Sequence, residues 1–419
     1  MVNKTVLENG LRIVSERLEH FMSVSLGIWV NVGSRDEGEK DNGVSHFIEH
    51  MIFKGTAARN SLRIAKELDA IGGLSNAFTG TEYTCFHSRV LDRHLHDLVG
   101  ILCDIFLHSL FDAQDMNRER QVILQEINML EDTPDEQIHV LLSSLFWMNH
   151  PLGMPVMGTP QTVSAINKET VLNHIRHFHT PGRIIVAAAG NVEHESLVGF
   201  LRPYFEALPQ VGEDRLRTAP KGNAAISCRY KDLEQVHVCL GGAGPHLSSD
   251  LRFAAAVLNT ILGGNMSSRL FQEIREKRGL AYNVYSFLSS FLDSGLLGIY
   301  LGTDAGQANR ALEVIHREIR KIQKGKVSRT DLRATKEHLI GGLLLSSENT
   351  DTQMMRLAKN EGVFGRHVSY DEVVARIEKV TVDDVVAVAE QAFKGRGVSL
   401  VTLGPLEEKD LDLSYAVFD

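Results

Sequence analysis

The sequence has few cysteines and no long hydrophobic run. Its 419 residues include four cysteines, and none of them stands in a pair or in a C-x-x-C spacing: Cys85, Cys103, Cys228 and Cys239. This usage argues against a disulfide framework or a cysteine-ligated metal site, and it favours reduced, buried thiols in a cytoplasmic protein. No segment approaches the ~18 uncharged apolar residues of a membrane span, and residues 1–10 lack the features of a secretory signal.

The sequence also lacks a large excess of charge of one sign. The net charge is -9 over the whole length, which argues against a nucleic-acid-binding surface. Charged residues make up 23% and hydrophobic residues 43%, as in a soluble globular protein. Because a single domain usually holds roughly 100–200 residues, the length predicts two to four domains.

Residues 44–56, VSHFIEHMIFKGT, carry an unusual set of side chains. Apolar residues recur at the spacing of one helix face, and His46, Glu49 and His50 fall together on the opposite face. Two imidazoles one turn apart can bind one metal ion. A carboxylate beside the open coordination position can accept a proton from metal-bound water. The segment therefore predicts half of a metal site together with a general base.

A catalytic zinc site generally needs a third protein ligand. The helix expected over residues 115–131 offers Glu119, Glu126 and Glu131. Glu126 lies among apolar residues on what we expect to be a largely buried helix, where a carboxylate without a partner is costly. Glu119 lies two turns earlier on the same face, about 10 Å away, where it could orient a histidine ligand.

Other histidines form weaker candidates for a metal site. His174, His177 and His179 are the next densest group, but no glutamate lies in helical register with them. His94 and His96 point to different helix faces. Most of the 18 histidines are expected to be ordinary core or surface residues.

The remaining patterns predict an alternation of strands and helices. A hairpin is expected over 5–14, a strand over 22–32, helices over 62–71, 91–108 and 115–131, one or two strands over 75–90, helices within 160–179 and a strand over 183–189. The helix over 115–131 should stop near Pro134. Residues 208–223 carry proline and glycine without apolar periodicity, which is typical of a linker.

An internal repeat is suggested by matches about half the chain apart. At an offset of 208, Gly55 aligns with Gly263 and Leu62 with Leu270, and residues 76–78 align with 283–285 at an offset of 207. We therefore predict two homologous α+β halves, 1–212 and 213–419, each a mainly antiparallel sheet flanked by helices.

The repeat predicts a difference between the halves. At the offset of 208, the positions of His46, Glu49 and His50 are taken by three apolar residues: Ala254, Val257 and Leu258. The first half should therefore carry the chemistry, and the second, without metal ligands, should enclose the substrate.

The run HFIEHMIFKGT at 46–56, with Glu126 76 positions after His50, closely resembles the pitrilysin-type (inverzincin) metallopeptidases. It looks most like their short two-domain branch, which includes the mitochondrial processing peptidase beta subunit and bacterial processing-protease-like proteins. The resemblance covers the whole chain, including SNAFT at 75–79 and SSRLFQEIREKRGLAY at 267–282. It implies that His46, His50 and Glu126 bind zinc, Glu49 is the general base and Glu119 is an assisting carboxylate.

The resemblance also implies where substrate binds. Asn76, Ala77 and Phe78 would lie at an edge strand to which a peptide adds as an extra strand. Arg275 and Tyr282 would reach the peptide from the second half, although an arginine at a charged helix end and a tyrosine in a strand are ordinary in themselves. The two halves would close as a clamshell around a chamber.

We therefore expect a zinc-dependent endopeptidase that cleaves peptides or unfolded segments. A homodimer is the expected assembly, or a heterodimer with a paralogue. Two alternatives are a non-catalytic scaffold subunit and a peptidase active only beside a metal-free paralogue. The intact set of His46, Glu49, His50 and Glu126 counts against the scaffold, whereas the paired peptidase stays open.

Overall fold

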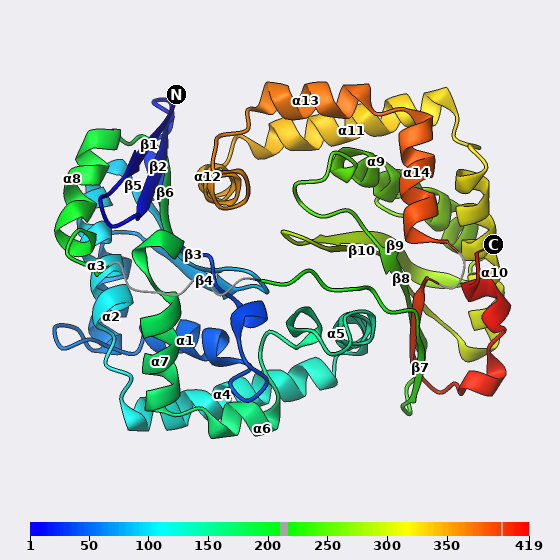
Figure 1. Ribbon diagram of the computed structural model, residues 1–419, viewed down its shortest axis with the longest axis horizontal. Helices are drawn as coiled ribbons and strands as arrows, with labels where there is room; N and C mark the ends of the chain where they lie inside the picture. The colour runs from blue at the N-terminus through cyan, green and yellow to red at the C-terminus, as the bar shows by residue number, and fades with distance from the viewer. Residues whose placement is uncertain (210–216, 395–396, 419) are drawn as a thin grey trace. The chain divides into compact units, whose positions relative to one another are not determined.

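A computed structural model describes residues 1–209, 217–394 and 397–418 (Figure 1). The chain divides into two compact units. Unit 1 comprises Met1–Asn128, Met154–Arg217 and Ser346–His367, and unit 2 comprises Met129–Gly153, Thr218–Leu345 and Val368–Asp419. Each unit has its own sheet and its own hydrophobic core.

The sheet of unit 1 has the strand order β1-β2-β6-β3-β5-β4. Its strands are β1 (Val2–Val6), β2 (Arg12–Arg17), β3 (Ser23–Val30), β4 (Leu74–Thr79), β5 (Thr84–Leu91) and β6 (Ile184–Gly190). Neighbours run antiparallel except β2 and β6, which are parallel. The predicted hairpin is β1–β2, and the segment 75–90 forms two strands.

Helices of unit 1 pack their apolar stripes into its core. They are α1 (Val44–Ile52), α2 (Ser61–Ala70), α3 (Leu95–His108), α4 (Ala113–Glu131), α6 (Pro160–Ala165), α7 (Lys168–Phe178), α8 (His194–Phe205) and α12 (Thr350–Phe364). The last turn of α4 is assigned to unit 2. In α1 the buried apolar residues are those that the spacing predicted. This helix contacts β4, β5 and α7, so its opposite face is left for the polar side chains.

Unit 2 repeats the topology of unit 1 with one strand fewer. Its sheet has the order β7-β11-β8-β10-β9, in which only β7 and β11 are parallel. The strands are β7 (Ile226–Tyr230), β8 (Val236–Ala243), β9 (Ala281–Ser290), β10 (Gly295–Thr303) and β11 (Ser399–Gly404). This order matches that of unit 1 without β1. The prediction of two mainly antiparallel sheets flanked by helices is confirmed.

The described part of unit 2 has fewer α-helices than that of unit 1. They are α5 (Pro134–Phe146), α9 (Arg252–Leu262), α10 (Ala308–Gln323), α11 (Arg329–Ser346), α13 (Tyr370–Lys379) and α14 (Val382–Ala392). A short π-helical segment, η5 (Phe271–Glu276), precedes β9. The sequence patterns did not predict α5. The predicted stop near Pro134 is confirmed, because α4 ends at Glu131. Pro134 itself occupies the first turn of α5, where proline lacks only a donor that would be unpaired anyway.

Two helices at equivalent places in the repeat are exchanged between the units. After α4 the chain forms α5, which packs on β8 and β11 of unit 2, and after α11 it forms α12, which packs on β2, β3 and β6 of unit 1. Glycine allows each close approach. A Cβ at Gly27 would lie 2.6 Å from Met354 Sδ, and one at Gly241 would lie 3.0 Å from Leu142 Cδ2.

The exchange makes both compact units discontinuous in sequence. The predicted boundary at 212/213 falls among residues 210–216, which lie outside the described residues. The boundary between the two homologous halves therefore stays a prediction. The compact units are divided differently, because unit 2 includes α5 from the first half of the sequence and unit 1 includes α12 from the second half.

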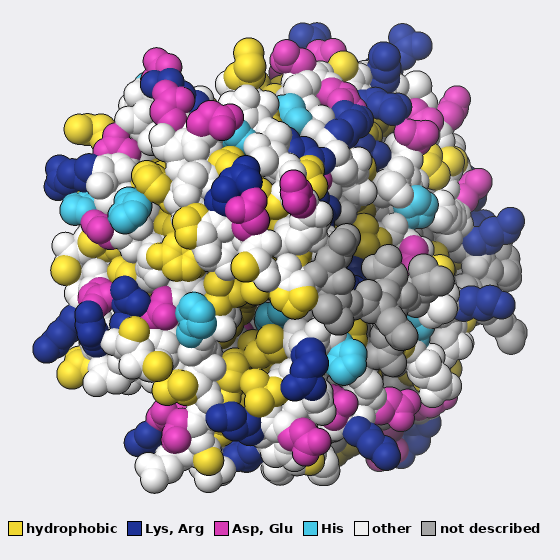
Figure 2. Space-filling model, turned by 60° about the vertical axis from the view of Figure 1, so that its left-hand side comes forward, with side chains coloured by type: hydrophobic (Ala, Val, Ile, Leu, Met, Phe, Trp, Pro, Cys, Tyr) yellow, Lys and Arg dark blue, Asp and Glu magenta, His cyan; other side chains and the backbone are white. Residues whose placement is uncertain are grey.

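Three further features concern the expectations about membrane spans, cysteines and surface charge. No described helix combines the length and the apolar character needed to cross a membrane. Cys85, Cys103 and Cys239 are buried free thiols, and Cys228 is partly exposed. On the face drawn in Figure 2, acidic and basic side chains are interspersed.

Candidate metal centre

The N-terminus of α1 is held by a buried carboxylate. Glu37 accepts hydrogen bonds from the Gly43 N–H (2.7 Å), the Ser45 N–H (2.8 Å) and the Asn42 side chain (3.0 Å). Burial raises the pKa of Glu37, and these hydrogen bonds oppose that rise. A carboxylate at this position satisfies unpaired N–H groups and interacts favourably with the helix dipole. Gly43 has a φ of 96°, a left-handed conformation suited to glycine.

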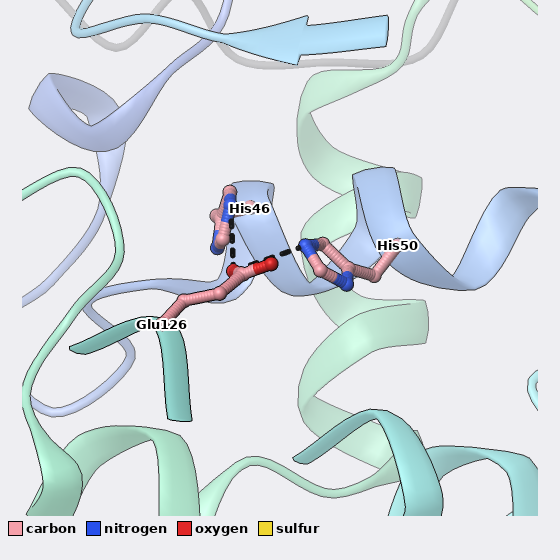
Figure 3. A group of neighbouring side chains, drawn as sticks. All are labelled: His46, His50 and Glu126. Carbon is pink, nitrogen blue, oxygen red and sulfur yellow. Dashed lines mark ion pairs between the residues drawn. The ribbon is translucent and has the colours of Figure 1, made fainter. Parts of the chain in front are cut away.

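The other face of α1 directs two imidazoles at one carboxylate. Figure 3 shows His46 and His50 facing Glu126, which comes from α4. Glu126 Oε2 lies 3.8 Å from His46 Nε2 and 3.4 Å from His50 Nε2. One ligand atom from each of the three residues lies within 4.8 Å of the others. Among the residues that the structure describes, this is the one group of three or more that could hold a metal ion.

The donor set and its spacing fit a zinc ion. Ligand atoms at ~2.0–2.1 Å from a tetrahedral zinc lie about 3.3 Å apart, close to the two distances at Glu126. Burial, with a smaller effect of His50, lowers the pKa of His46 to about 4. A neutral imidazole is the form that binds a metal. Two nitrogens and one carboxylate oxygen leave a fourth position for water.

Glu119, on the same face of α4, supports His50. Glu119 Oε2 lies 3.2 Å from His50 Nδ1, and its Oε1 lies 2.7 Å from Lys54 Nζ. The carboxylate can only accept, so this contact assigns the ring proton to Nδ1 and leaves the Nε2 lone pair facing Glu126. Lys54 follows α1 within the quoted motif, yet the sequence offered no sign that it would hold Glu119.

Glu49 lies beside the ligands and is bound by the end of β4. Thr79 Oγ1 donates a hydrogen bond to Glu49 Oε2 at 2.5 Å. Burial raises the pKa of Glu49, whereas this hydrogen bond lowers it. Thr79 lay within the quoted SNAFT run, but nothing in its spacing predicted contact with the carboxylate, because the two residues meet only through the sheet.

The expected substrate-binding residues of the first half lie on β4, at the edge of the sheet. The Asn76 side chain accepts a hydrogen bond from the Ala77 N–H at 2.9 Å. Phe78 is partly buried, and its ring packs edge-on against Trp29 and Tyr83 at 5.5 and 6.0 Å between centroids. Phe78 therefore anchors the strand, whereas the Asn76 side chain is exposed.

The expected residues of the second half lie in unit 2. Arg275 is on η5 and Tyr282 is on β9. The Arg275 guanidinium lies 4.2 Å from the Tyr282 ring centroid and donates to the Tyr282 carbonyl at 3.2 Å. The Tyr282 side chain is 71% exposed. The structure brings these two residues together, and their relation to the metal centre stays a prediction.

One expectation about the helix that carries Glu126 is corrected by the structure. α4 is not largely buried: one stripe faces the core, and the Glu126 side chain is 33% exposed, so its carboxylate is not isolated in an apolar interior.

His174, the weaker metal candidate on α7, is buried, and its Nε2 lies 3.3 Å from Ser45 Oγ. Burial first, and then neighbouring cations, lowers the pKa of His174 to about 3.

The duplicated fold and the H-x-x-E-H helix with its third carboxylate define the class of inverted-motif metallopeptidases. The chain belongs to peptidase family M16. The family model described as "Insulinase (Peptidase family M16)" matches residues 12–160. The model described as "Peptidase M16 inactive domain" matches residues 165–339.

Bacterial relatives match over nearly the whole chain. An uncharacterized zinc protease of Bacillus subtilis (strain 168), YmxG, is 39% identical over 393 residues, which are 94% of this chain and 96% of that protein. An uncharacterized zinc protease of Streptomyces coelicolor is 40% identical and covers 97% of this chain and 90% of its own length. The names of these relatives suggest zinc as the metal.

Solved structures share the fold. A protease from Helicobacter pylori has a TM-score of 0.89 at 21% identity, covering 96% of this chain and 99% of its own. A Pseudomonas fluorescens structure described as a peptidase M16 inactive domain has a TM-score of 0.90 at 19% identity, covering 97% and 98%.

Proposed function

We propose that this chain is a zinc-dependent endopeptidase in which His46, His50 and Glu126 bind the metal and Glu49 is the general base. The observation that carries the proposal is the convergence of the three ligand atoms with Glu49 one residue from a ligand. A scaffold subunit has no need of a base beside two imidazoles. Membership of family M16 and the names of the relatives support a peptidase.

Each residue of the centre has a separate task in this mechanism. Zinc, when bound, lowers the pKa of a water molecule towards ~7 and polarises the scissile carbonyl. Glu49 takes the proton from the attacking water and delivers it to the leaving amine. Its pKa is raised by burial, which favours proton uptake. Glu119, held by Lys54, keeps the His50 ring oriented.

We propose that the substrate is an extended peptide that adds to the open edge of β4. The Ala77 N–H is bonded to the Asn76 side chain, so a peptide carbonyl can take the place of the amide oxygen without leaving that N–H unpaired. Backbone pairing of this kind makes little demand on sequence. It requires an unfolded segment, because a folded protein presents few extended strands with free hydrogen-bonding groups.

The assembly is part of the proposal. We propose a cytoplasmic homodimer, with a heterodimer containing a metal-free paralogue as the second possibility. Arg275 and Tyr282 would contact the bound peptide in either assembly. One zinc per chain without turnover by the purified protein would favour the heterodimer, and mass measurement in solution would then show a missing partner.

The substitution Glu49→Gln tests the general base. The variant should retain about one zinc per chain and lose hydrolysis of a quenched peptide by about 10²–10⁴-fold, because only the proton acceptor is removed. Glu39→Gln, on the exposed loop before α1, is the matched control and should behave as wild type. Wild-type turnover by Glu49→Gln would refute the assignment. Chelation should abolish hydrolysis, and added zinc should restore it.

A further inference from the structure

The open edge of β4 ends at the carboxylate of Glu49. The Gly80 N–H donates to the Tyr83 carbonyl at 2.8 Å, which makes this a hydrogen-bonded pair of the β4–β5 ladder. In an antiparallel ladder every second residue turns its N–H and C=O away from the partner strand. Ser75, Ala77 and Thr79 are therefore the residues of β4 whose N–H and C=O groups face the open edge. The hydrogen bond from the Ala77 N–H to the Asn76 side chain agrees with this assignment.

The Thr79 hydroxyl is directed to Glu49. It donates to Oε2 at 2.5 Å. Thr79 is also the last residue of β4. The next edge N–H, that of Ala77, lies two residues away, about 6.6 Å along the strand.

One loop holds both partners of this contact. The Arg35 N–H donates to the Thr81 carbonyl at 2.9 Å, directly after β4. Two residues later, Glu37 binds the N-terminus of α1, which carries Glu49. The buried ion pair between Arg35 and Glu82, at 2.6 Å, fixes the loop to the β4–β5 turn. The strand end and the base are therefore positioned by the same rigid segment.

We propose that Thr79 is a positioning residue that ends the peptide-docking edge of β4 and orients Glu49. This inference rests on the proposed function. An added peptide pairs with Ala77 and leaves the sheet at Thr79, because β4 ends there and the Thr79 hydroxyl holds Glu49 against the strand end. The hydroxyl also occupies Oε2, so the proton from the attacking water goes to Oε1. The cleaved bond thereby lies at a constant number of residues from the one paired with Ala77.

The substitution Thr79→Val removes the hydroxyl and keeps the shape of the side chain. We expect kcat to fall by about tenfold or more, because a hydrogen bond to a charged group is lost, with KM changed by less than about twofold and the zinc content unchanged. Mass spectrometry of the products should show additional cleavage sites one or two residues from the main one. Thr79→Ser should restore both kcat and the single site. Thr81→Val, the same change two residues on, is the control and should resemble wild type.

Unchanged kcat and unchanged products in Thr79→Val would overturn the inference, as would loss of zinc. Activity of Glu49→Gln would instead refute the proposed function, so the two failures are distinguishable. A crystal structure of the wild-type protein with a peptide whose scissile bond is reduced to CH2–NH gives a test without turnover. The peptide should accept from the Ala77 N–H, and a peptide bonded to the Thr79 N–H would contradict the proposal.

Discussion

Helices α1 and α9 occupy equivalent places in the two units, beside the edge strands β4 and β9, but they bury different residues. In α1, His46, Glu49 and His50 lie on the half-buried face that meets α4. In α9, the aligned residues Ala254, Val257 and Leu258 are at most 2% exposed. The same topology therefore serves as a metal centre in one unit and as ordinary core in the other.

The helix that supplies the third ligand differs in the same way. When α4 and α11 are aligned at their first residues, Ala113 and Arg329, Glu126 corresponds to Gly342 and Glu119 to Thr335. Unit 2 thus lacks the counterpart of the ligand and of the carboxylate that supports it. Every polar position of the centre has a smaller or apolar residue in the repeat, as expected where a helix face contributes only to packing.

The largest expected effect is that of removing a ligand from unit 1. His50→Ala should lose zinc and reduce peptide hydrolysis by about 10³-fold or more, because the water is no longer activated. The side chain is half-buried and polar, so the free energy of unfolding of the metal-free protein should change little. Bound-metal analysis and hydrolysis assays check this. Full zinc occupancy in the variant would show that the ligand set is wrong.

The aligned position in unit 2 should respond in the opposite way. Leu258→Ala should leave the zinc content unchanged and lower the free energy of unfolding by about 2–5 kcal/mol, because a fully buried side chain is truncated. Denaturant unfolding monitored in unit 2 measures the loss. If Leu258→Ala released zinc while His50→Ala destabilised the fold, the contrast between the two helices would be reversed.

A smaller effect should appear as acid sensitivity of unit 1. His174, on α7, has a pKa lowered to about 3 in the folded state, against 6.5 for the unfolded chain. Unfolding therefore takes up a proton as the pH falls below about 6.5, and His174 alone should cost about 2 kcal/mol of stability by pH 5. His174→Val copies the buried Val388 at the aligned position of α14. It should flatten the pH dependence of Tm between pH 7 and 5, and an unchanged slope would exclude His174 as the cause.

Local sequence patterns predicted much of the fold and the central residues of the metal site. The apolar spacing of residues 44–52 predicted α1 with its correct buried face, and the repeat predicted two sheets of one topology. A metal half-site on α1 followed from residue chemistry, because two histidines and a glutamate on one helix face are a local arrangement. Glu126 was one of three carboxylates on its helix, and the family resemblance singled it out.

Tertiary contacts account for what the sequence patterns missed. The hydrogen bond between Thr79 and Glu49 joins residues 30 apart, and Lys54 meets Glu119 through the packing of α4 on α1. Pro134 was interpreted only as a stop signal, although proline is equally suited to a helix start, so α5 was not predicted. The spacing of residues within a segment does not indicate which distant side chain will form hydrogen bonds or ion pairs with its polar groups.

The exchanged helices have a consequence for the order of synthesis. The face of the unit 1 sheet that carries Trp29 is covered by Met354 and its neighbours on α12. These residues leave the ribosome more than 150 positions after β6, the last strand of that sheet. The metal ligands are thus translated early, but the sheet behind them is completed only when most of the chain has emerged. A nascent chain that stops at the midpoint would expose an apolar sheet face, which is an aggregation hazard that full translation removes.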